Sequence, residues 1–448
     1  MTNNMTAGNP AKLILRFSIP LLIGNLFQQL YNMVDTLIVG RTLGYQALAA
    51  VGVTGGLSFL ILGFVQGFTS GFTIPVAQRF GADDFEEMRS EVGMSVLLSV
   101  IITAILTVGS VLLTRPALEL MQTPDDIIDG AYTYIVIIFG GMVTITFYNL
   151  LSNILRALGD SKTPLIFLIV ASLLNIVLDL IFIRGVGMNV EGAALATVLS
   201  QMVSGILCLV VIVKKFPILH LKRRNFRFTW QRARRHLALG MPMAFQFSIT
   251  AVGVLILQAV LNGFGSETIA GYTAASKVEQ LSVQPLLSIG MAMATYSAQN
   301  FGAGKLDRVR AGAWAGTAIS AGFALFGAAI ILFLGRHISA LFMENPTEKI
   351  LDSSQIYLNT ISAFYIPLAM IFVFRNILQG VGKGLVPLMA GVSELVLRAV
   401  VAVVISPFLG YQGVCLAGPA AWVGAAIPLI LAYWWHSKRL LKEKTIAV

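Results

Sequence analysis

The hydrophobic positions of the chain gather into twelve long apolar runs that are separated by shorter polar stretches. A helix of about 20 apolar residues is long enough to cross a bilayer. The chain is 56% hydrophobic and only 12% charged, whereas soluble domains carry about 25% charged residues. The pattern therefore predicts an all-α polytopic membrane protein with twelve transmembrane helices at roughly 14–39, 47–78, 92–114, 131–155, 164–183, 192–213, 237–263, 269–298, 312–335, 353–378, 386–408 and 412–435.

The two halves of the chain repeat the same motifs at a nearly constant offset. The motif AQRFGADDFEEMR at 77–89 matches AQNFGAGKLDRVR at 298–310, and SNILRALGD at 152–160 matches RNILQGVGK at 375–383. Six runs per half is an even number, so both copies have the same orientation, which is a transporter arrangement. We predict an N-lobe of six helices at 1–213, a basic linker at 214–235 and a C-lobe of six helices at 236–448.

Basic residues are distributed unevenly between the two sides of the predicted bundle. Of the 31 lysines and arginines, 24 fall on the side of the termini, 5 fall on the opposite side, and Lys277 and Arg398 lie inside apolar runs. Because basic loops remain in the cytoplasm, this bias predicts a multi-pass protein of the cell (inner or plasma) membrane. Both termini are expected to be cytoplasmic.

The predicted linker contains nine basic residues with Phe and Trp between them, in a chain of net charge +10. A nucleic-acid patch is one interpretation. A segment that lies on lipid headgroups suits a membrane protein better, so we expect membrane lipids as partners and no nucleic acid. The acidic stretch at 83–91 and the stretch at 123–129 are interpreted as solvated loops.

The first apolar run carries a polar seam. Gly24, Gln28, Tyr31 and Asp35 fall on one face at helical spacing. A carboxylate in hydrocarbon costs about 2.5–3.5 kcal/mol on insertion scales, and no basic residue lies in this run beyond its first turn. We expect the seam to face a water-filled cavity in which Asp35 binds protons or cations.

A second aspartate follows the same pattern in the fifth run. Asp179 lies four residues before the end of its run, as Asp35 does, and both are about 6 Å below that edge. Polar side chains also recur at helical spacing in neighbouring runs, and a cavity shared by several helices would satisfy their hydrogen bonds. Bonds between neighbouring helices, worth about 0.6 kcal/mol each, are the alternative for the amides and hydroxyls. Both interpretations stay open for Thr146, Asn149, Asn153, Ser172, Asn175, Thr197, Gln201 and Ser204.

Other charges inside the runs belong to the second half. Glu394 and Arg398 are four residues apart in the favourable order, which predicts a structural ion pair. Lys277 and Glu279 are two residues apart and cannot pair with each other. A secondary site in the C-terminal half, formed by Lys277, Glu279 and Arg398, therefore stays open.

Further patterns limit the chemistry of the chain. Gly63, Gly67 and Gly71 form a double GxxxG, which favours close helix packing. Cys208 and Cys415 lie inside apolar runs and predict no disulfide framework. The chain has no Walker loop and no catalytic set, so we expect no enzyme, no metal and no cofactor other than a coupling ion.

These motifs together resemble the multidrug and toxic compound extrusion (MATE) family over nearly the whole chain. The resemblance rests on SIPLLIGNLFQQLYNMVDTLIVGRTLG at 18–44, AQRFGA, NILRALGDSKTP at 153–164, and the second-half motifs AQNFGA and NILQGVGKGLVP. It implies twelve helices in two six-helix lobes of the MATE/MOP fold. It also implies export of amphipathic, usually cationic drugs in exchange for H⁺ or Na⁺.

Within this family the chain is similar to the branch named for the DNA-damage-inducible F protein, whose ion site lies in the N-lobe. The resemblance implies an ion or proton site at Asp35, Asp179, Asn175 and Thr197. It implies substrate contacts at Gln28, Tyr31, Asn153 and Asn175, and a hinge in the first helix at Pro20 and Gly24.

The resulting hypothesis is a monomeric, secondary-active multidrug efflux antiporter driven by H⁺ or Na⁺. One alternative is a flippase for lipid-linked oligosaccharides on the same architecture, with Lys277 and Arg398 as anchors for an anionic substrate. A membrane receptor or an intramembrane enzyme is a further alternative, which the repeat and the lack of a catalytic set disfavour.

Overall fold

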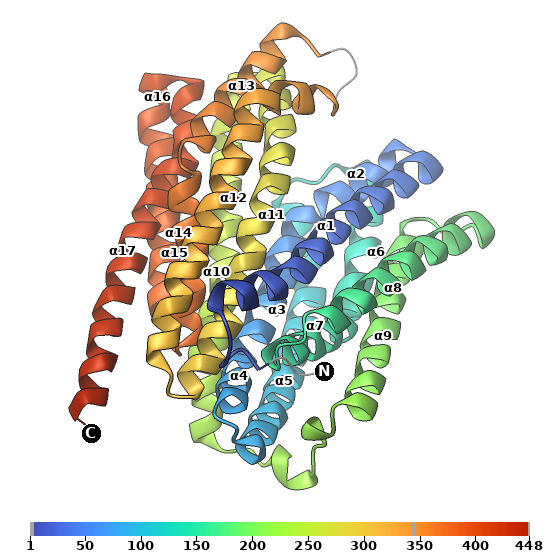
Figure 1. Cartoon of the computed structure of the whole chain (residues 1–448). Helices are drawn as coiled ribbons and strands as arrows, with labels where there is room; N and C mark the ends of the chain where they lie inside the picture. Colours follow the sequence, from blue (N-terminus) through green and yellow to red (C-terminus); the bar gives the residue numbers. More distant parts are fainter. Residues whose placement is uncertain (1–3, 343–345, 447–448) are drawn as a thin grey trace. The chain divides into compact units, whose positions relative to one another are not determined.

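The computed structural model describes residues 4–342 and 346–446 (Figure 1). Every regular element in these ranges is a helix, so the predicted all-α architecture is confirmed. Contacts divide the chain into two compact units. Unit 1 comprises Met1–Asn4 and Ile23–Ser248, and unit 2 comprises Met5–Leu22 and Ile249–Val448.

Two long helices each contribute to both units. Helix α1 (Pro10–Leu43) belongs to unit 2 up to Leu22 and to unit 1 from Ile23, and α10 (Trp230–Leu261) belongs to unit 1 up to Ser248. Unit 1 further contains α2 (Tyr45–Val53), α3 (Gly55–Phe72), α4 (Ile74–Gly81), α5 (Phe85–Leu120), α6 (Asp125–Gly140), α7 (Met142–Ala157), α8 (Lys162–Asp179), η1 (Leu180–Gly185), α9 (Val190–Lys215), η2 (Pro217–Leu219) and η3 (Arg223–Phe226).

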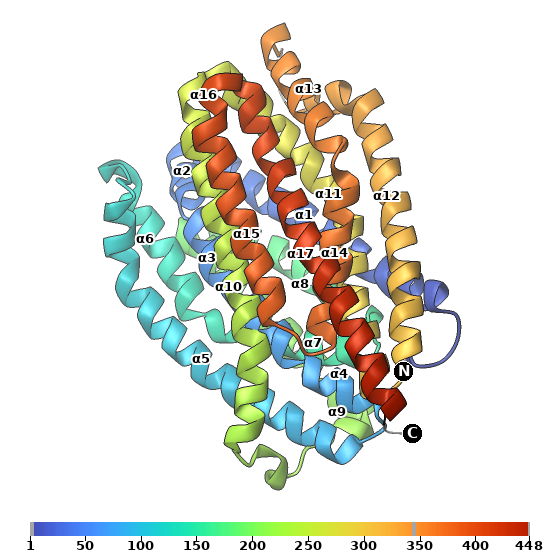
Figure 2. The ribbon, with the colours of Figure 1, turned by 90° about the vertical axis from the view of Figure 1, so that its left-hand side faces the viewer.

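Unit 2 is built from the remaining helices, and Figure 2 shows α15 and α17 side by side within it. Its core includes Tyr296 of α11 and Tyr365 of α14, each almost fully buried. The elements are η4 (Asn262–Phe264), α11 (Ser266–Gly302), α12 (Leu306–Ala340), α13 (Glu348–Ser362), α14 (Tyr365–Gly380), α15 (Leu385–Val400), η5 (Val401–Ile405), α16 (Ser406–Leu409) and α17 (Tyr411–Ile446).

Eleven of the twelve predicted membrane helices match candidate spans in the described part of the chain, and the eighth, at 269–298, does not. Nine helices are long and apolar enough to cross a membrane, or eleven if each of two bent pairs is one span. Helix α11, 37 residues long, covers the eighth predicted run and also carries Lys277 and Glu279. The chain is thus a multi-pass membrane protein.

Two predicted helices are broken rather than continuous. The fourth run bends by 46° between α6 and α7, and the tenth bends by 52° between α13 and α14. At the first break, a Cβ on Gly141 would lie 2.4 Å from Cγ2 of Val198, so α9 approaches closely there. At the second break, Pro367 lies in the first turn of α14. Backbone N–H groups of a first turn have no partner within the helix, so a proline there removes no helical hydrogen bond.

The GxxxG residues of α3 pack against α10, as predicted. A Cβ on Gly67 would lie 2.5 Å from Cα of Ala244, and one on Gly71 would lie 2.5 Å from Cα of Gly240. Such backbone-to-backbone approach is available only to small residues. The first turns of α10 are therefore held tightly in unit 1.

Two stretches interpreted as solvated loops are largely helical, and those two interpretations are wrong. The acidic stretch at 83–91 is mostly the start of α5, which begins at Phe85, and the stretch at 123–129 contains the start of α6 at Asp125. The predicted linker at 214–235 includes the end of α9 and the first residues of α10. Helix capping explains the first error, because the Asp84 carboxylate accepts a hydrogen bond from the Glu87 N–H at 3.2 Å.

Candidate ion-binding site

The two predicted aspartates meet in unit 1. Asp35 comes from α1 and Asp179 from the last residue of α8, and their carboxyl groups are in hydrogen-bonding contact. Asp179 is fully buried and Asp35 is partly buried. Two ionised carboxylates offer only acceptors. A proton on one carboxyl group supplies the donor that a hydrogen bond between the two needs.

Asn175 lies one turn before Asp179 and is fully buried beside it. With its Nδ2 directed at Asp179, the amide donates to Oδ2 at 2.8 Å, and its Oδ1 accepts from the Thr197 backbone N–H at 3.0 Å. The opposite orientation leaves a 3.3 Å bond to the Thr197 hydroxyl instead. We assign the first orientation because it satisfies both ends of the amide.

Two tyrosines complete the surroundings of the aspartates. The Tyr31 hydroxyl is in hydrogen-bonding contact with Thr197, which links α1 to α9. Tyr134 of α6 interacts electrostatically with both carboxylates. Sequence reasoning missed Tyr134, although a tyrosine inside the fourth apolar run was the available signal. Four helices thus contribute polar groups to one site.

Each aspartate also keeps one unsatisfied oxygen. Oδ1 of Asp35 and Oδ1 of Asp179 are buried without a hydrogen-bond partner. Within the described residues, neither carboxylate takes part in an ion pair with a lysine, arginine or histidine. Buried acceptors without donors are costly, so the arrangement suits a visiting proton or small cation. No group of three His, Cys, Asp or Glu side chains in the described part suits a metal ion.

The chain leaves the site through an unusual turn. Asp179 is followed directly by the π-helix η1, in which the Val186 N–H donates to the Ile181 carbonyl five residues earlier at 2.8 Å. A second π-helix, η5, follows α15 at the equivalent place of the other repeat. π-Helical turns are frequent at functional sites. The π-helix η1 therefore supports a functional role for the residues at the end of α8.

Other predicted site residues lie elsewhere. Gln28 donates to Asn32 on its own helix at 3.3 Å. Asn153 of α7 donates to the hydroxyls of Thr69 and Ser70 on α3 at 3.3 Å each. For Asn153 the observed contact is therefore the helix-to-helix bond of the alternative interpretation.

The predicted hinge residues flank the unit boundary. Pro20 and Gly24 are both buried in α1, and the boundary between Leu22 and Ile23 falls between them. Pro20 removes one hydrogen bond from the helix. A Cβ on Gly24 would meet Leu168 of α8 at 3.4 Å, so this glycine sits against unit 1.

The predicted charges of the second half all lie in unit 2, where Glu279 interacts electrostatically with Arg398. Arg398 pairs with Glu394 at 2.8 Å, as predicted, and Arg375 of α14 pairs with the other oxygen of Glu394 at 3.0 Å. Glu279 accepts a hydrogen bond from the Tyr357 hydroxyl at 2.7 Å. Lys277 is exposed, and the secondary site of Lys277, Glu279 and Arg398 stays a prediction.

The halves of the chain each match one sequence profile. The MatE family profile matches residues 20–181 and 242–404, which together are more than half of the chain. The chain belongs to the MatE family. The two matches begin 222 residues apart, so the repeat predicted from the motifs is confirmed.

This MatE protein is similar to several multidrug resistance proteins. It is 30% identical over 449 residues to the probable multidrug resistance protein YpnP of Bacillus subtilis, with 98% of this chain and 99% of that protein covered. It is 28% identical over 431 residues to the probable multidrug resistance protein NorM of Thermotoga maritima, covering 94% and 89%.

A solved structure agrees with the fold over nearly all of this MatE chain. An outward-facing multidrug resistance MATE family transporter of the MOP superfamily matches with a TM-score of 0.90 at 25% identity, and 99% of both chains is covered. The family resemblance and the MATE/MOP fold predicted from the motifs are thereby confirmed. The assignment to one branch of the family stays a prediction.

Proposed function

We propose that this MatE family protein is a secondary-active multidrug efflux antiporter. It exports amphipathic, cationic drugs in exchange for H⁺ or Na⁺. The single observation that carries the coupling assignment is the Asp35–Asp179 pair, in which each acid keeps an unsatisfied buried oxygen and has no basic partner among the residues that the structure describes. The names of the relatives support the drug substrates.

The coupling ion acts on a site to which four helices contribute polar groups. A proton or Na⁺ between Asp35 and Asp179 removes the repulsion of two carboxylates at hydrogen-bonding distance. Asn175 and Thr197 hold Asp179 in place through their hydrogen bonds, and Tyr31 joins α1 to the same set. Loading or unloading the ion therefore changes how firmly α1 is held on α8 and α9.

Movement of α1 links the ion to the drug. Pro20 and Gly24 provide a place where α1 can bend, and the unit boundary lies between them. Gln28 and Tyr31 line the same seam and are proposed substrate contacts, together with Asn153 and Asn175. Exchange requires that ion and drug favour different conformations, which bending of α1 provides.

The surface of the 214–235 segment supports the proposed orientation. Three of its arginines form ion pairs with acids of α5: Arg224 with Glu86, Arg232 with Glu87 and Arg235 with Glu91. The remaining basic side chains are exposed and have no ion-pair partner among the described residues. We propose that they lie on lipid headgroups at the cytoplasmic face of the cell membrane: Lys214, Lys215, Lys222, Arg223, Arg227 and Arg234.

The decisive experiment measures drug uptake into proteoliposomes driven by a pH gradient or by a sodium gradient. Wild-type protein is expected to exchange a cationic drug against one of the two ions, and Asp35→Asn and Asp179→Asn are expected to abolish that exchange. Asp129→Asn, which removes an exposed carboxylate at the start of α6, is the matched control. Full exchange by both site variants at normal reconstitution levels contradicts the proposal.

A further inference from the structure

The repeat places a cation in unit 2 where unit 1 has a neutral amide. The NILRALGD motif begins at residue 153 and NILQGVGK begins at residue 376, which is an offset of 223. Carried forward along α8 and α15, the same offset pairs Asn175 with Arg398 and Asp179 with Ala402. Both helices continue directly into a π-helix, η1 and η5. The two places therefore correspond in structure as well as in sequence.

The positions that correspond to the two acids of the ion site are apolar in unit 2. The family matches begin at residues 20 and 242, and this offset of 222 pairs Asp35 with Leu257 and Tyr31 with Gly253. Leu257 and Ala402 belong to one apolar cluster, in which they are 8% and 0% exposed. Packed side chains therefore fill the place that the acid pair takes in unit 1.

Arg398 lies one turn before Ala402 and contacts α10. It is 8% exposed, and a Cβ on Gly253 would lie 2.9 Å from its Nη1 and 3.4 Å from its Cδ. Both residues belong to unit 2. In unit 1 the corresponding residue of α1 is Tyr31, which is in hydrogen-bonding contact with Thr197 of the ion site. Arg398 thus contacts α10 at the level at which the ion site contacts α1.

The charge of Arg398 is balanced by acids of its own unit. Glu394 Oε1 accepts from Arg398 Nη2 at 2.8 Å, and Glu394 Oε2 accepts from Arg375 Nη2 at 3.0 Å. Glu279 of α11 interacts electrostatically with Arg398 and accepts from the Tyr357 hydroxyl at 2.7 Å. The formal charges of the two arginines and the two acids cancel.

The two places therefore differ in the source of their positive charge. In the part of the chain that the structure describes, Asp35 and Asp179 have no basic partner, so a proton or a cation has to come from outside. Glu394 and Glu279 have a cation that is covalently attached to α15. A free cation that approached them would meet the Arg398 guanidinium and be repelled.

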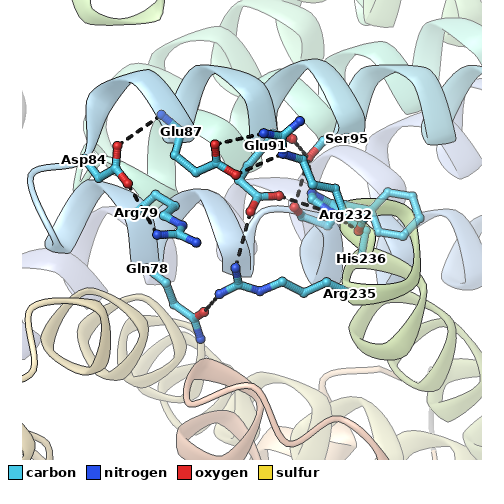
Figure 3. Close-up of polar contacts among 10 residues, drawn as sticks. Gln78, Arg79, Asp84, Glu87, Glu91, Ser95, Arg232, Arg235 and His236 are labelled. Carbon is cyan, nitrogen blue, oxygen red and sulfur yellow. Dashed lines mark hydrogen bonds and ion pairs between the residues drawn. The ribbon is translucent and has the colours of Figure 1, made fainter. Parts of the chain in front are cut away.

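The start of α10 shows the same use of the chain's own cations. Figure 3 shows Arg232 and Arg235 of α10 directed at acids of α5 in unit 1. Arg232 makes two bonds of 2.9 Å to the oxygens of Glu87, and Arg235 contacts Glu91 at 3.3 Å. The attachment of α10 to its neighbours therefore includes ion pairs that need no visiting ion, in contrast to the contact of α1 with α8.

We propose that Arg398 is a built-in counter-cation, which takes in unit 2 the part that the coupling ion takes in unit 1. This inference rests on the proposed function of the Asp35–Asp179 pair. Because the charge of Arg398 cannot leave, unit 2 has no vacant place for a coupling ion, and α10 stays attached to α15 throughout transport. The predicted secondary site of Lys277, Glu279 and Arg398 is then closed to that ion. Arg398 is a positioning residue that confines ion-dependent movement to α1.

Removal of the Arg398 side chain tests whether it stands in for an ion. Arg398→Ala leaves room for a free guanidinium ion beside Gly253, while Arg375 still pairs with Glu394. The melting temperature of the full chain in detergent is measured with low concentrations of guanidinium chloride or choline chloride at equal ionic strength. Guanidinium is expected to raise it saturably in the variant and not in the wild type. No rise in the variant overturns the proposal.

Three further variants separate a bound cation from a general salt effect. Arg398→Asn, which carries the residue that unit 1 has at this place, is expected to respond to guanidinium as Arg398→Ala does. Arg398→Lys keeps a charge of its own and is expected to show no response. Arg336→Ala, which removes an arginine paired with Asp352 on the exposed part of α12, is the matched control. A rise of equal size in Arg336→Ala overturns the proposal.

Hydrogen–deuterium exchange tests the difference between α1 and α10. Asp179→Asn supplies a donor to Asp35 and is expected to slow exchange of Ile23–Leu43 in α1 about fivefold, as for one net hydrogen bond, with residues 249–261 of α10 unchanged. Arg398→Ala is expected to raise exchange of residues 249–261 by about tenfold or more, because a buried side chain no longer packs on Gly253. Guanidinium should reverse that rise.

The two segments report on the two proposals separately. Exchange of residues 249–261 that follows the state of the Asp35–Asp179 pair, or that is unchanged in Arg398→Ala, overturns the role of Arg398. Exchange of Ile23–Leu43 that is unchanged in Asp179→Asn contradicts the proposed ion site instead, whatever α10 does.

Discussion

The carboxyl groups of Asp35 and Asp179 are in hydrogen-bonding contact, yet each keeps one buried oxygen without a donor. This arrangement does not favour stability, because unsatisfied buried acceptors and neighbouring carboxylates both raise the free energy of the folded state. A site of this kind persists when function requires it. Stability and transport are therefore expected to respond in opposite directions to changes at these positions.

Asp179→Asn is expected to abolish ion-coupled efflux while raising the melting temperature. The new amide supplies an N–H donor to the carboxylate of Asp35 and removes the charge repulsion. The gain in unfolding free energy is about 1 kcal/mol, as for one net hydrogen bond. Drug resistance of cells and thermal unfolding of the purified protein in detergent measure the two effects.

Asn175→Ala provides the comparison for that prediction. It removes the 2.8 Å donor to Asp179 Oδ2 and the acceptor for the Thr197 N–H, so it leaves a third site oxygen unsatisfied. We expect lower stability and lower transport together. A melting temperature for Asp179→Asn below that of the wild type would contradict the account of the acid pair.

Gly67→Ala is expected to loosen the packing of α3 on α10. The added methyl group would lie 2.5 Å from Cα of Ala244, and backbone atoms cannot yield cheaply. Overpacking of this kind costs about 1–3 kcal/mol, which thermal unfolding would report.

Gly109→Ala is the matched control, because a methyl group at Gly109 of α5 meets no atom within 4 Å. A glycine in the middle of a helix costs about 0.5–1 kcal/mol relative to alanine, so this variant should be slightly stabilised. Equal losses in the two variants would mean that the α3–α10 contact is not the cause.

The sequence predicted those features that depend on local pattern. Hydropathy located the membrane helices, and motif spacing revealed the repeat. The rarity of carboxylates in apolar runs singled out Asp35 and Asp179, which do come together. Each of these signals is contained in a single helix or a single repeat, so no knowledge of tertiary contacts was needed.

Tertiary partners explain the features that were missed. Glu91 belongs to an acidic stretch that looks solvated, yet it is 1% exposed because Arg235 and His236, about 145 residues later, cover it. Arg375 lies 19 residues before its partner Glu394, beyond the reach of a helical spacing rule. The sequence pattern around Asn153 fitted a residue that lines a cavity and a residue that bonds to a neighbouring helix equally well. Only its hydrogen bonds to α3 show that it makes the helix-to-helix contact.

Neutralising the exposed cations of the 214–235 segment is expected to reduce the thermal stabilisation of the protein by anionic lipid. Each lysine or arginine near an anionic surface contributes about 1 kcal/mol. Replacing Lys214, Lys215, Arg223 and Arg227 by Gln should reduce the thermal stabilisation that phosphatidylglycerol gives to the purified protein. Transport in phosphatidylcholine liposomes should be unaffected.

Replacing Arg41 and Arg184, two basic residues of the predicted opposite side, by Gln provides the control for this lipid effect. It should leave the response to phosphatidylglycerol intact, because these residues are expected to face the other leaflet. If both sets of replacements reduce the response equally, the effect reflects total charge and not a surface of the segment.

Glu394→Gln is expected to be the most damaging single change in unit 2. The carboxylate joins the side chains of Arg375 and Arg398, which are 15% and 10% exposed. Removing it leaves two guanidinium groups close together without a counter-charge, and breaking a buried pair costs about 3–5 kcal/mol. Replacing Arg375 by Met in the same variant should restore part of the loss, because one unpaired charge is then removed. Thermal unfolding of the single and double variants measures the coupling, and simple addition of the two losses would show that the three side chains do not act as one group.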